Sequence, residues 1–227
     1  ASASSAVSFT TYESVLEAVA STTNIDMIAT KSITLNKSLN FAQTSGQSVT
    51  FTASGGNISF TNASDTIQTS GGDIVMNASG TLSVGKMKTN GGNITLTGGD
   101  FSLSGTLDAG KGTLTILGMS GETIGLDGIT AGTTGATVST ICDSTACGLT
   151  LTQSELNFIT AAKLVVGDSS SGKIYVDGVT TAHISGGTSL NSSGSGGSVI
   201  FGTGGSTLKI ATINAGNGVT INGDLSI

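Results

Sequence analysis

Apolar residues recur in short alternating runs along most of the chain, and the runs are separated by Gly, Asn or Asp. Residues 91–117 show one complete repeat and the start of the next, with apolar residues at Ile94, Leu96, Phe101, Leu103, Leu107, Leu114 and Ile116. Alternation with period two turns one face of a strand inward. The pattern restarts after about 20 residues, a period typical of stacked repeat architectures. The chain is therefore predicted to be all-β, and specifically a β-solenoid.

A Gly-Gly-Asn/Asp-Ile unit marks the corners of the predicted coils. It occurs at residues 55–58, 71–74 and 91–94. Glycine permits positive φ at a corner, and Asn or Asp can hydrogen-bond the turning backbone before the next apolar residue points inward. The strand pattern begins at Ile25, resumes at Leu149 after a looser segment, continues through Leu156 and Ile159, and reaches Ile227.

One segment near the start has the spacing of a helix. Residues 10–13, Thr-Thr-Tyr-Glu, match a capping box. Apolar residues then recur at helical spacing, at Tyr12, Val15, Leu16 and Val19. A helix here would cover the open end of the first coil and hide its strand edges. We expect residues 1–30 to form an N-terminal segment with this capping helix, and residues 31–227 to form the coils.

Two segments depart from the strand pattern. Residues 129–148 are expected to form a long loop, which contains the two cysteines, Cys142 and Cys147. In an oxidising compartment this pair could close a small disulfide loop. A zinc site is less favoured, because zinc usually takes four ligands and the chain has one His and no further Cys. The Gly/Ser-rich residues 185–197 are expected to form a flexible surface loop or a poorly ordered turn.

Composition supports a solenoid and excludes several classes of protein. Thirty-five Gly and no Pro suit coils that donate backbone hydrogen bonds to both neighbours. The 37% hydrophobic content and its alternation argue against disorder. A net charge of −6 with eight basic residues argues against binding to nucleic acid or to an anionic membrane surface. No apolar run is long enough to span a bilayer. The low charge points to secretion.

Three stretches carry a resemblance to a known family: residues 122–126 (Glu-Thr-Ile-Gly-Leu), 149–168 and 172–176. They resemble repeats of large secreted surface proteins of the filamentous haemagglutinin type, and the likeness extends more loosely over residues 33–227. This resemblance implies a right-handed parallel β-helix, export, a filament or stalk, and adhesive or structural work. The opening helix and residues 25–41 are similar to the capped start of pectate-lyase-type β-helices.

Candidate catalytic groups are scattered along the sequence. Most of the aspartates lie beside Gly, where a role in turns explains them: Asp100, Asp108, Asp127, Asp143, Asp168 and Asp177. Asp168 and Asp177 flank one predicted strand and are the best catalytic pair, although they lie at opposite ends of it. His183 has no evident partner and is expected to be a solvated loop residue. We assign no catalytic residue, no metal site and no cofactor.

These features favour a non-enzymatic extracellular protein, a structural or adhesive part of a filament, stalk or surface appendage. The alternatives are a polysaccharide-active β-helix enzyme and, less favoured, an ice-binding protein with flat ranks of Thr. Expected partners are further copies of the chain, or the rest of a longer chain, stacked at the C-terminal end, together with surface glycans or other extracellular proteins. Sequons offer glycosylation sites at Asn36, Asn57, Asn62, Asn77, Asn93 and Asn191.

Overall fold

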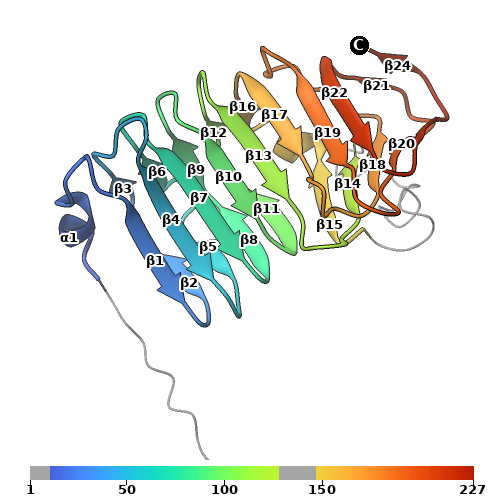
Figure 1. Ribbon diagram of the computed structural model, residues 1–227. Helices are drawn as coiled ribbons and strands as arrows, with labels where there is room; N and C mark the ends of the chain where they lie inside the picture. The colour runs from blue at the N-terminus through green and yellow to red at the C-terminus, as the bar shows by residue number, and fades with distance from the viewer. Residues whose placement is uncertain (1–10, 128–146) are drawn as a thin grey trace, which may run out of the picture.

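The computed structural model describes residues 11–127 and 147–227. The chain winds into an elongated solenoid of about seven turns, with almost no helix (Figure 1). The strands of successive turns pair in parallel, so the turns stack along one axis. The predicted β-solenoid is therefore confirmed.

The longest wall of the solenoid is an eight-stranded sheet, which we call sheet A. Its strands, in spatial order, are β1 (Ile25–Ala29), β4 (Ser48–Ala53), β7 (Asp73–Ala78), β10 (Ile94–Thr97), β13 (Thr113–Leu117), β17 (Lys163–Val166), β19 (Thr188–Ser192) and β22 (Ile210–Ala215). Ile94 pairs with Leu114 and Thr95 with Thr115, which is the register expected from the 20-residue repeat.

Shorter strands form the other walls. Sheet B holds β2 (Ile33–Leu35), β5 (Ile58–Phe60), β8 (Thr81–Val84) and β11 (Asp100–Leu103), and sheet D continues this second wall with β15 (Leu149–Thr152), β14 (Ile124–Asp127), β18 (Ile174–Asp177), β20 (Val199–Phe201) and β23 (Val219–Ile221). The third wall consists of β3 (Leu39–Asn40), β6 (Thr66–Gln68), β9 (Lys86–Lys88), β12 (Leu107–Asp108) and β16 (Ile159–Thr160), followed by the pair β21 (Ser206–Thr207) and β24 (Leu225–Ser226).

The core is a column of apolar side chains that run along the axis. Equivalent positions of successive turns supply one layer each, as Val49, Ile74, Ile94, Leu114 and Leu164 do on sheet A, where each pairs with the next. All five are fully buried. Because the side chains of a strand alternate between its faces, the short polar residues between them point outward.

The corners between the third wall and sheet A are held by polar side chains. The buried Thr89 hydroxyl donates to the Gly92 carbonyl oxygen at 2.5 Å. Asn93 Oδ1 accepts the Thr113 N–H of the next turn at 2.9 Å, so an amide side chain extends the ladder where the strand has not yet begun. Gly91 has φ of 110°, as predicted for this unit. Gly55 lies at a different corner, between β4 and β5, and its φ is not positive. Glycine is required there because a Cβ would lie 2.5 Å from the Thr30 carbonyl oxygen.

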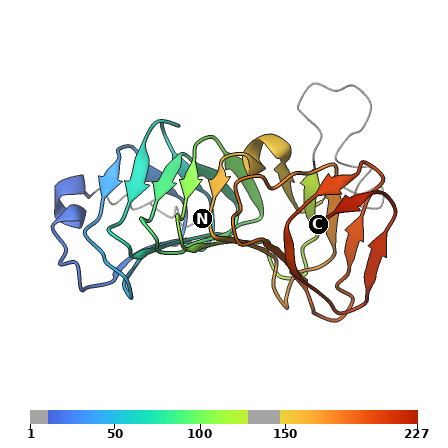
Figure 2. The same cartoon turned by 90° about the horizontal axis from the view of Figure 1, so that it is seen from above.

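An extra strand enters the second wall in the middle of the molecule. After β14 the chain leaves the wall and returns as β15. This strand lies between β11 and β14: it pairs with β14 and contacts β11. Sheet A gains no strand there, since β13 pairs directly with β17. Within the described residues, the four strands of sheet B and five of sheet D thus face eight in sheet A. The solenoid bends accordingly: sheet A, seen along the lower side of Figure 2, arches.

A short helix, α2 (Gln153–Leu156), follows the extra strand. The sequence pattern predicted strand through Leu156, and this is wrong. Thr152 and Glu155 form a capping box, which the sequence displays but which the strand pattern obscured. Glu155 also accepts the Leu103 N–H at 3.0 Å, which attaches α2 to β11.

In the third wall, Gln153 of α2 takes the place of a neighbouring strand (a rung of the wall) beside Thr180. Its side-chain oxygen accepts the Thr180 N–H at 2.7 Å, and its side-chain nitrogen donates to the Thr180 carbonyl oxygen at 2.9 Å. A carboxamide carries one acceptor and two donors, so it can make both bonds that a neighbouring strand would offer.

The N-terminal helix α1 (Glu13–Glu17) is shorter than predicted, and its N-cap is Tyr12, without a side-chain cap. The predicted capping box is therefore wrong; Thr10 lies outside the described residues. Leu16 packs against the core, and the Glu17 carboxylate accepts the Asn40 N–H at 2.6 Å. The role of α1 as a cap stays a prediction.

Residues 185–197 were expected to form a loop or a turn; residues 193–197 do form a turn, but residues 188–192 form the buried strand β19. Thr188, Leu190 and Ser192 of β19 are fully buried. Ser192 can be buried because its hydroxyl donates to the Gly172 carbonyl oxygen of the preceding turn. Gly/Ser-rich composition indicates a loop only where such side-chain bonds are not available.

Replacing Gln153 by Met should destabilise the solenoid by about 1–3 kcal/mol, because two hydrogen bonds to Thr180 are lost. Urea unfolding followed by circular dichroism would measure the change. Ser154→Ala on the exposed side of α2 is the matched control and should stay within about 0.5 kcal/mol of the unsubstituted protein. Equal stability of the two variants would show that Gln153 does not replace a rung.

Candidate functional site

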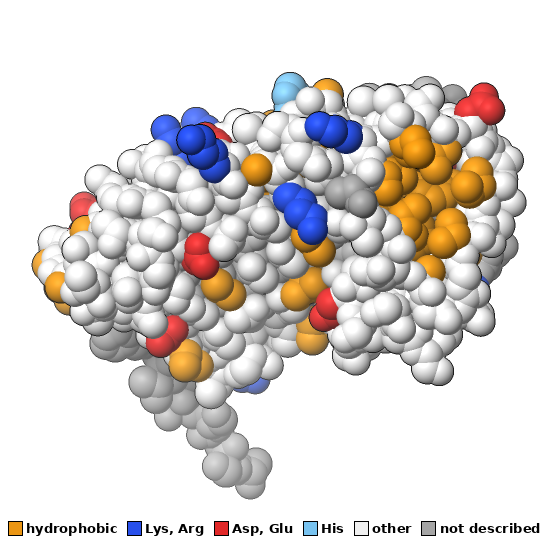
Figure 3. Space-filling model, turned by 45° about the horizontal axis from the view of Figure 1, so that its top comes forward, with side chains coloured by type: hydrophobic (Ala, Val, Ile, Leu, Met, Phe, Trp, Pro, Cys, Tyr) orange, Lys and Arg blue, Asp and Glu red, His pale blue; other side chains and the backbone are white. Residues whose placement is uncertain are grey.

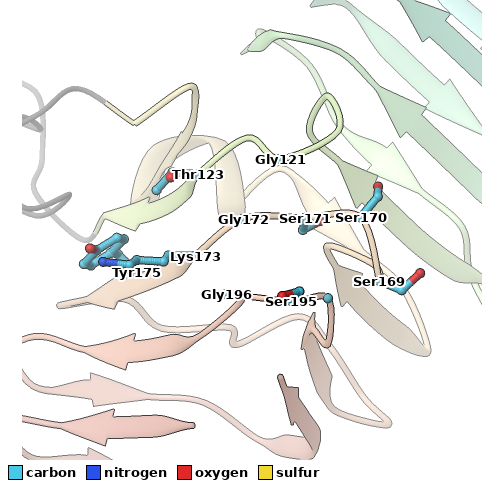
Figure 4. A pocket seen from close by; sticks show the side chains of 11 residues that line it. Gly121, Thr123, Ser169, Ser170, Ser171, Gly172, Lys173, Tyr175, Ser195 and Gly196 are labelled. Atoms are coloured by element: carbon cyan, nitrogen blue, oxygen red, sulfur yellow. The ribbon is translucent and has the colours of Figure 1, made fainter. Parts of the chain in front are cut away.

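A hollow lies at the corner between sheets A and D, and we call it the corner hollow (Figure 4). Its volume is about 420 Å³. Three stacked corners line it: Gly121 and Thr123, then residues 169–173 with Tyr175, and then residues 194–196. Hydroxyl groups and backbone form most of its wall.

Backbone hydrogen bonds hold the three corners together. Gly121 donates its N–H to the Ser170 carbonyl oxygen at 2.7 Å, and Gly172 donates to the Glu122 carbonyl oxygen at 2.9 Å. A Cβ on Gly172 would lie 2.6 Å from the Gly121 carbonyl oxygen, so this close approach requires glycine. The wall of the corner hollow is thus fixed by the stacking of the turns.

Asp168 shapes the middle corner. Its Oδ1 accepts hydrogen bonds from the Ser170 N–H and hydroxyl, each at 2.7 Å, and from the Ser171 hydroxyl at 3.2 Å. Burial acts to raise the pKa of Asp168, but the hydrogen bonds from Ser170 and Ser171 outweigh it and lower the pKa below its ordinary value. The carboxylate therefore stays charged and stabilises the turn through these hydrogen bonds.

Glu122 lies at the first corner, between two residues that line the hollow. Its Oε2 accepts the Met119 N–H at 2.6 Å. Partial burial raises the pKa of the Glu122 carboxyl above its usual value, the Met119 hydrogen bond opposes this, and the charge of Asp100 adds to the rise.

The hydroxyls of two serines at the hollow remain to meet a ligand. The side chains of Ser169 and Ser195 are exposed, and their hydroxyls make no hydrogen bond within the described part of the chain. The side chains of Lys173 and Tyr175 project to the same side of β18, as Figure 4 shows. Tyr175 is buried and packs with Cys147 and Ile200. The hollow is suited to hydrogen bonding with a polar ligand.

The structure does not bring the candidate catalytic groups together. Asp168 lies in the corner that precedes β18, whereas Asp177 is the last residue of β18. Asp177 Oδ1 accepts the Gly204 N–H at 2.5 Å. Asp108 Oδ1 accepts the Gly110 N–H at 2.9 Å. His183 is exposed. In the described residues, no group of His, Cys, Asp and Glu is arranged to hold a metal ion.

The structure places one of the two cysteines and all six sequon asparagines. Cys142 lies outside the described residues, and Cys147 is buried, so the disulfide stays a prediction. Among the sequons, Asn36, Asn57, Asn62 and Asn93 have exposed side chains, whereas Asn77 and Asn191 are half-buried. The modification itself stays a prediction.

An apolar surface lies at the C-terminal end of the solenoid, and we call it the end face (Figure 3). Val219 and Ile221 of β23 are 46% and 57% exposed, and Ile213 and Leu225 are half-buried. On the side shown in Figure 3, acidic side chains lie singly and form no cluster. No described helix has the length and hydropathy needed to cross a membrane.

No protein-family model, curated protein or solved structure matches this chain.

Replacing Glu122 by Gln should stabilise the protein at pH 7. A carboxyl whose pKa is raised on folding binds its proton more tightly in the native state, so stability falls as pH rises through the range above the unfolded value, 4.5. A neutral carboxamide at this position avoids the loss. The gain should be a fraction of a kcal/mol, because solvent screens a partly exposed group.

Unfolding free energies measured in urea between pH 3 and pH 8 would test this. The difference between Glu122→Gln and the unsubstituted protein should vanish at the acid end, where the carboxyl is neutral in both states. Glu13→Gln, at an exposed position of α1, is the control. A gain that persists unchanged at pH 3 would contradict the assignment to burial of the charge.

Proposed function

We propose that this protein is an extracellular, non-enzymatic scaffold with a structural or adhesive role, part of a filament, stalk or surface appendage. The observation that carries the proposal is the use of polar side chains as structure: Asp168, Asp177 and Asn93 are each engaged in corner or inter-turn hydrogen bonds. Among the residues that the structure describes, these polar groups are therefore committed to the fold, and the stacked turns supply length and rigidity. The low charge and the resemblance to haemagglutinin-type repeats also support export.

Rigid display explains how such a rod would work. The solenoid holds its corners and loops at fixed positions, and binding groups on loops are carried by rigid scaffolds in many proteins. Weak contacts at several sites add through effective concentration when many copies lie on one surface. Right-handed winding, as in the resembling family, forms part of this proposal, and so does closure of the first turn by α1.

A glycan-array binding test, paired with a hydrolysis assay on polysaccharides, would test the proposal. We expect retention on surface glycans of the array, with no release of new reducing ends. The double variant Asp168→Asn/Asp177→Asn is the control for hydrolysis, and the unsubstituted protein should release no more reducing ends than this variant does. Hydrolysis that this variant loses would establish the alternative, a polysaccharide-active enzyme.

We also propose that a second copy of the chain covers the end face. The edges of β22, β23 and β24 are the last in their sheets, and Val219 and Ile221 line the exposed face beside them. Stacking would bury these side chains and pair the backbone groups of the strand edges, which otherwise favour association.

Sedimentation velocity over a range of concentrations would measure this association. Ile221→Lys should weaken it at least about tenfold, or roughly 1.4 kcal/mol, because a charge would be buried in the contact. Thr220→Lys on the same strand is the control, since Thr220 faces the opposite way from Ile221. A monomer at every concentration would contradict stacking between copies.

A further inference from the structure

We propose that the corner hollow binds a short neutral saccharide; this inference rests on the adhesive role proposed above and names the ligand class that the site would take. In the hollow, a cavity of about 420 Å³, exposed hydroxyls and a fixed backbone coincide. This volume lies near the lower end of the range for small-molecule sites, about 300–1,000 Å³.

The lining matches the hydrogen-bonding pattern of a sugar. Each hydroxyl of a saccharide both donates and accepts, and so does each serine or threonine hydroxyl. Ser169, Ser195 and Thr123 line the hollow from three different corners, and none of their hydroxyls bonds within the described chain. A ligand in the hollow could therefore be held from three sides.

Charge around the hollow favours a neutral ligand. Lys173 is the charged residue among the described ones that line it. Asp168 and Glu122 are the immediate neighbours of lining residues, so two carboxyl groups accompany one ammonium. Neither carboxyl lines the hollow, but their nearby negative charge would repel a polyanionic ligand, and Lys173 would repel a cationic one. The Lys173 ammonium carries three donors, so it can serve a sugar oxygen alongside its other contacts.

Contacts within the chain fix the shape of the corner hollow. Asp168 and the hydroxyls of Ser170 and Ser171 fix the middle corner, and Ser192 ties it to the next turn. Gly121 and Gly196 have φ of 78° and 86°, and a Cβ on either would meet no atom within 4 Å, so they border open space. A preformed site loses little conformational entropy on binding.

Affinity should be weak, because an open polar hollow exchanges hydrogen bonds to water for hydrogen bonds to the ligand. A dissociation constant of about 1 mM, or roughly −4 kcal/mol, is the expected scale for one site. Such contacts become useful when many copies act together.

The test is a titration of the ¹⁵N-labelled protein with maltotriose, cellotriose and a galacturonic acid trimer, followed by backbone amide shifts. At least one neutral trisaccharide should shift the amides of Lys173, Tyr175 and Gly196 in a saturable manner, and the acidic trimer should bind at least about tenfold more weakly. Ser195→Trp should abolish the shifts by filling the hollow. The matched control Ser70→Trp, at an exposed serine of an earlier corner, should not.

Circular dichroism would verify that both Trp variants fold, and Ser169→Leu is the second hollow-filling variant. No shift with either neutral sugar, tighter binding of the acidic trimer, or unchanged binding by a folded Ser195→Trp variant would each overturn the inference. Glycan-array retention is measured on the same variants. Retention that persists when the hollow is filled would overturn this site while leaving the adhesive role intact, whereas sugar binding without retention would reject the adhesive role alone.

Discussion

The parallel backbone ladder between successive turns is the constraint on which this structure depends. Each turn must offer its N–H and C=O groups to the next at a spacing of about 4.8 Å, because buried backbone groups are rarely left unpaired. The requirement is hardest to meet at corners, where the chain changes direction. There, side chains complete the ladder: Asp73 Oδ1 accepts the Asn93 N–H, and Asn93 Oδ1 accepts the Thr113 N–H. The absence of proline follows from the same requirement.

The same constraint accounts for the irregular middle of the molecule. The inserted strand β15 is accepted because β14 pairs with it along its full length. Gln153 then supplies both ladder bonds to Thr180 through its side chain. The corner hollow lies just beyond this insertion, on the corners that precede β14, β18 and β20. Local rules of hydrogen bonding thus determine both the regular turns and the place where they are interrupted.

Period-two alternation was enough to predict the solenoid and the register of Ile94 with Leu114, because burial on one face repeats from turn to turn. The prediction failed where polar side chains are buried and hydrogen-bonded, as Ser192 is, because Gly/Ser-rich composition alone predicts a loop there. It also missed α2, whose capping box at Thr152 and Glu155 was present in the sequence. The corner hollow could not be predicted, because residues 121, 170 and 195 meet only through the stacking of three turns.

The extra strand in the second wall has a consequence for the geometry of any longer assembly. One side of the rod is longer than the other by about one strand spacing, roughly 4.8 Å, over the same number of rungs on sheet A. The axis of the solenoid must therefore bend at β15, with sheet A on the inner side of the bend. Related solenoids could differ in the direction of their axis by the gain or loss of a single strand, while the turns on either side of it stay unchanged.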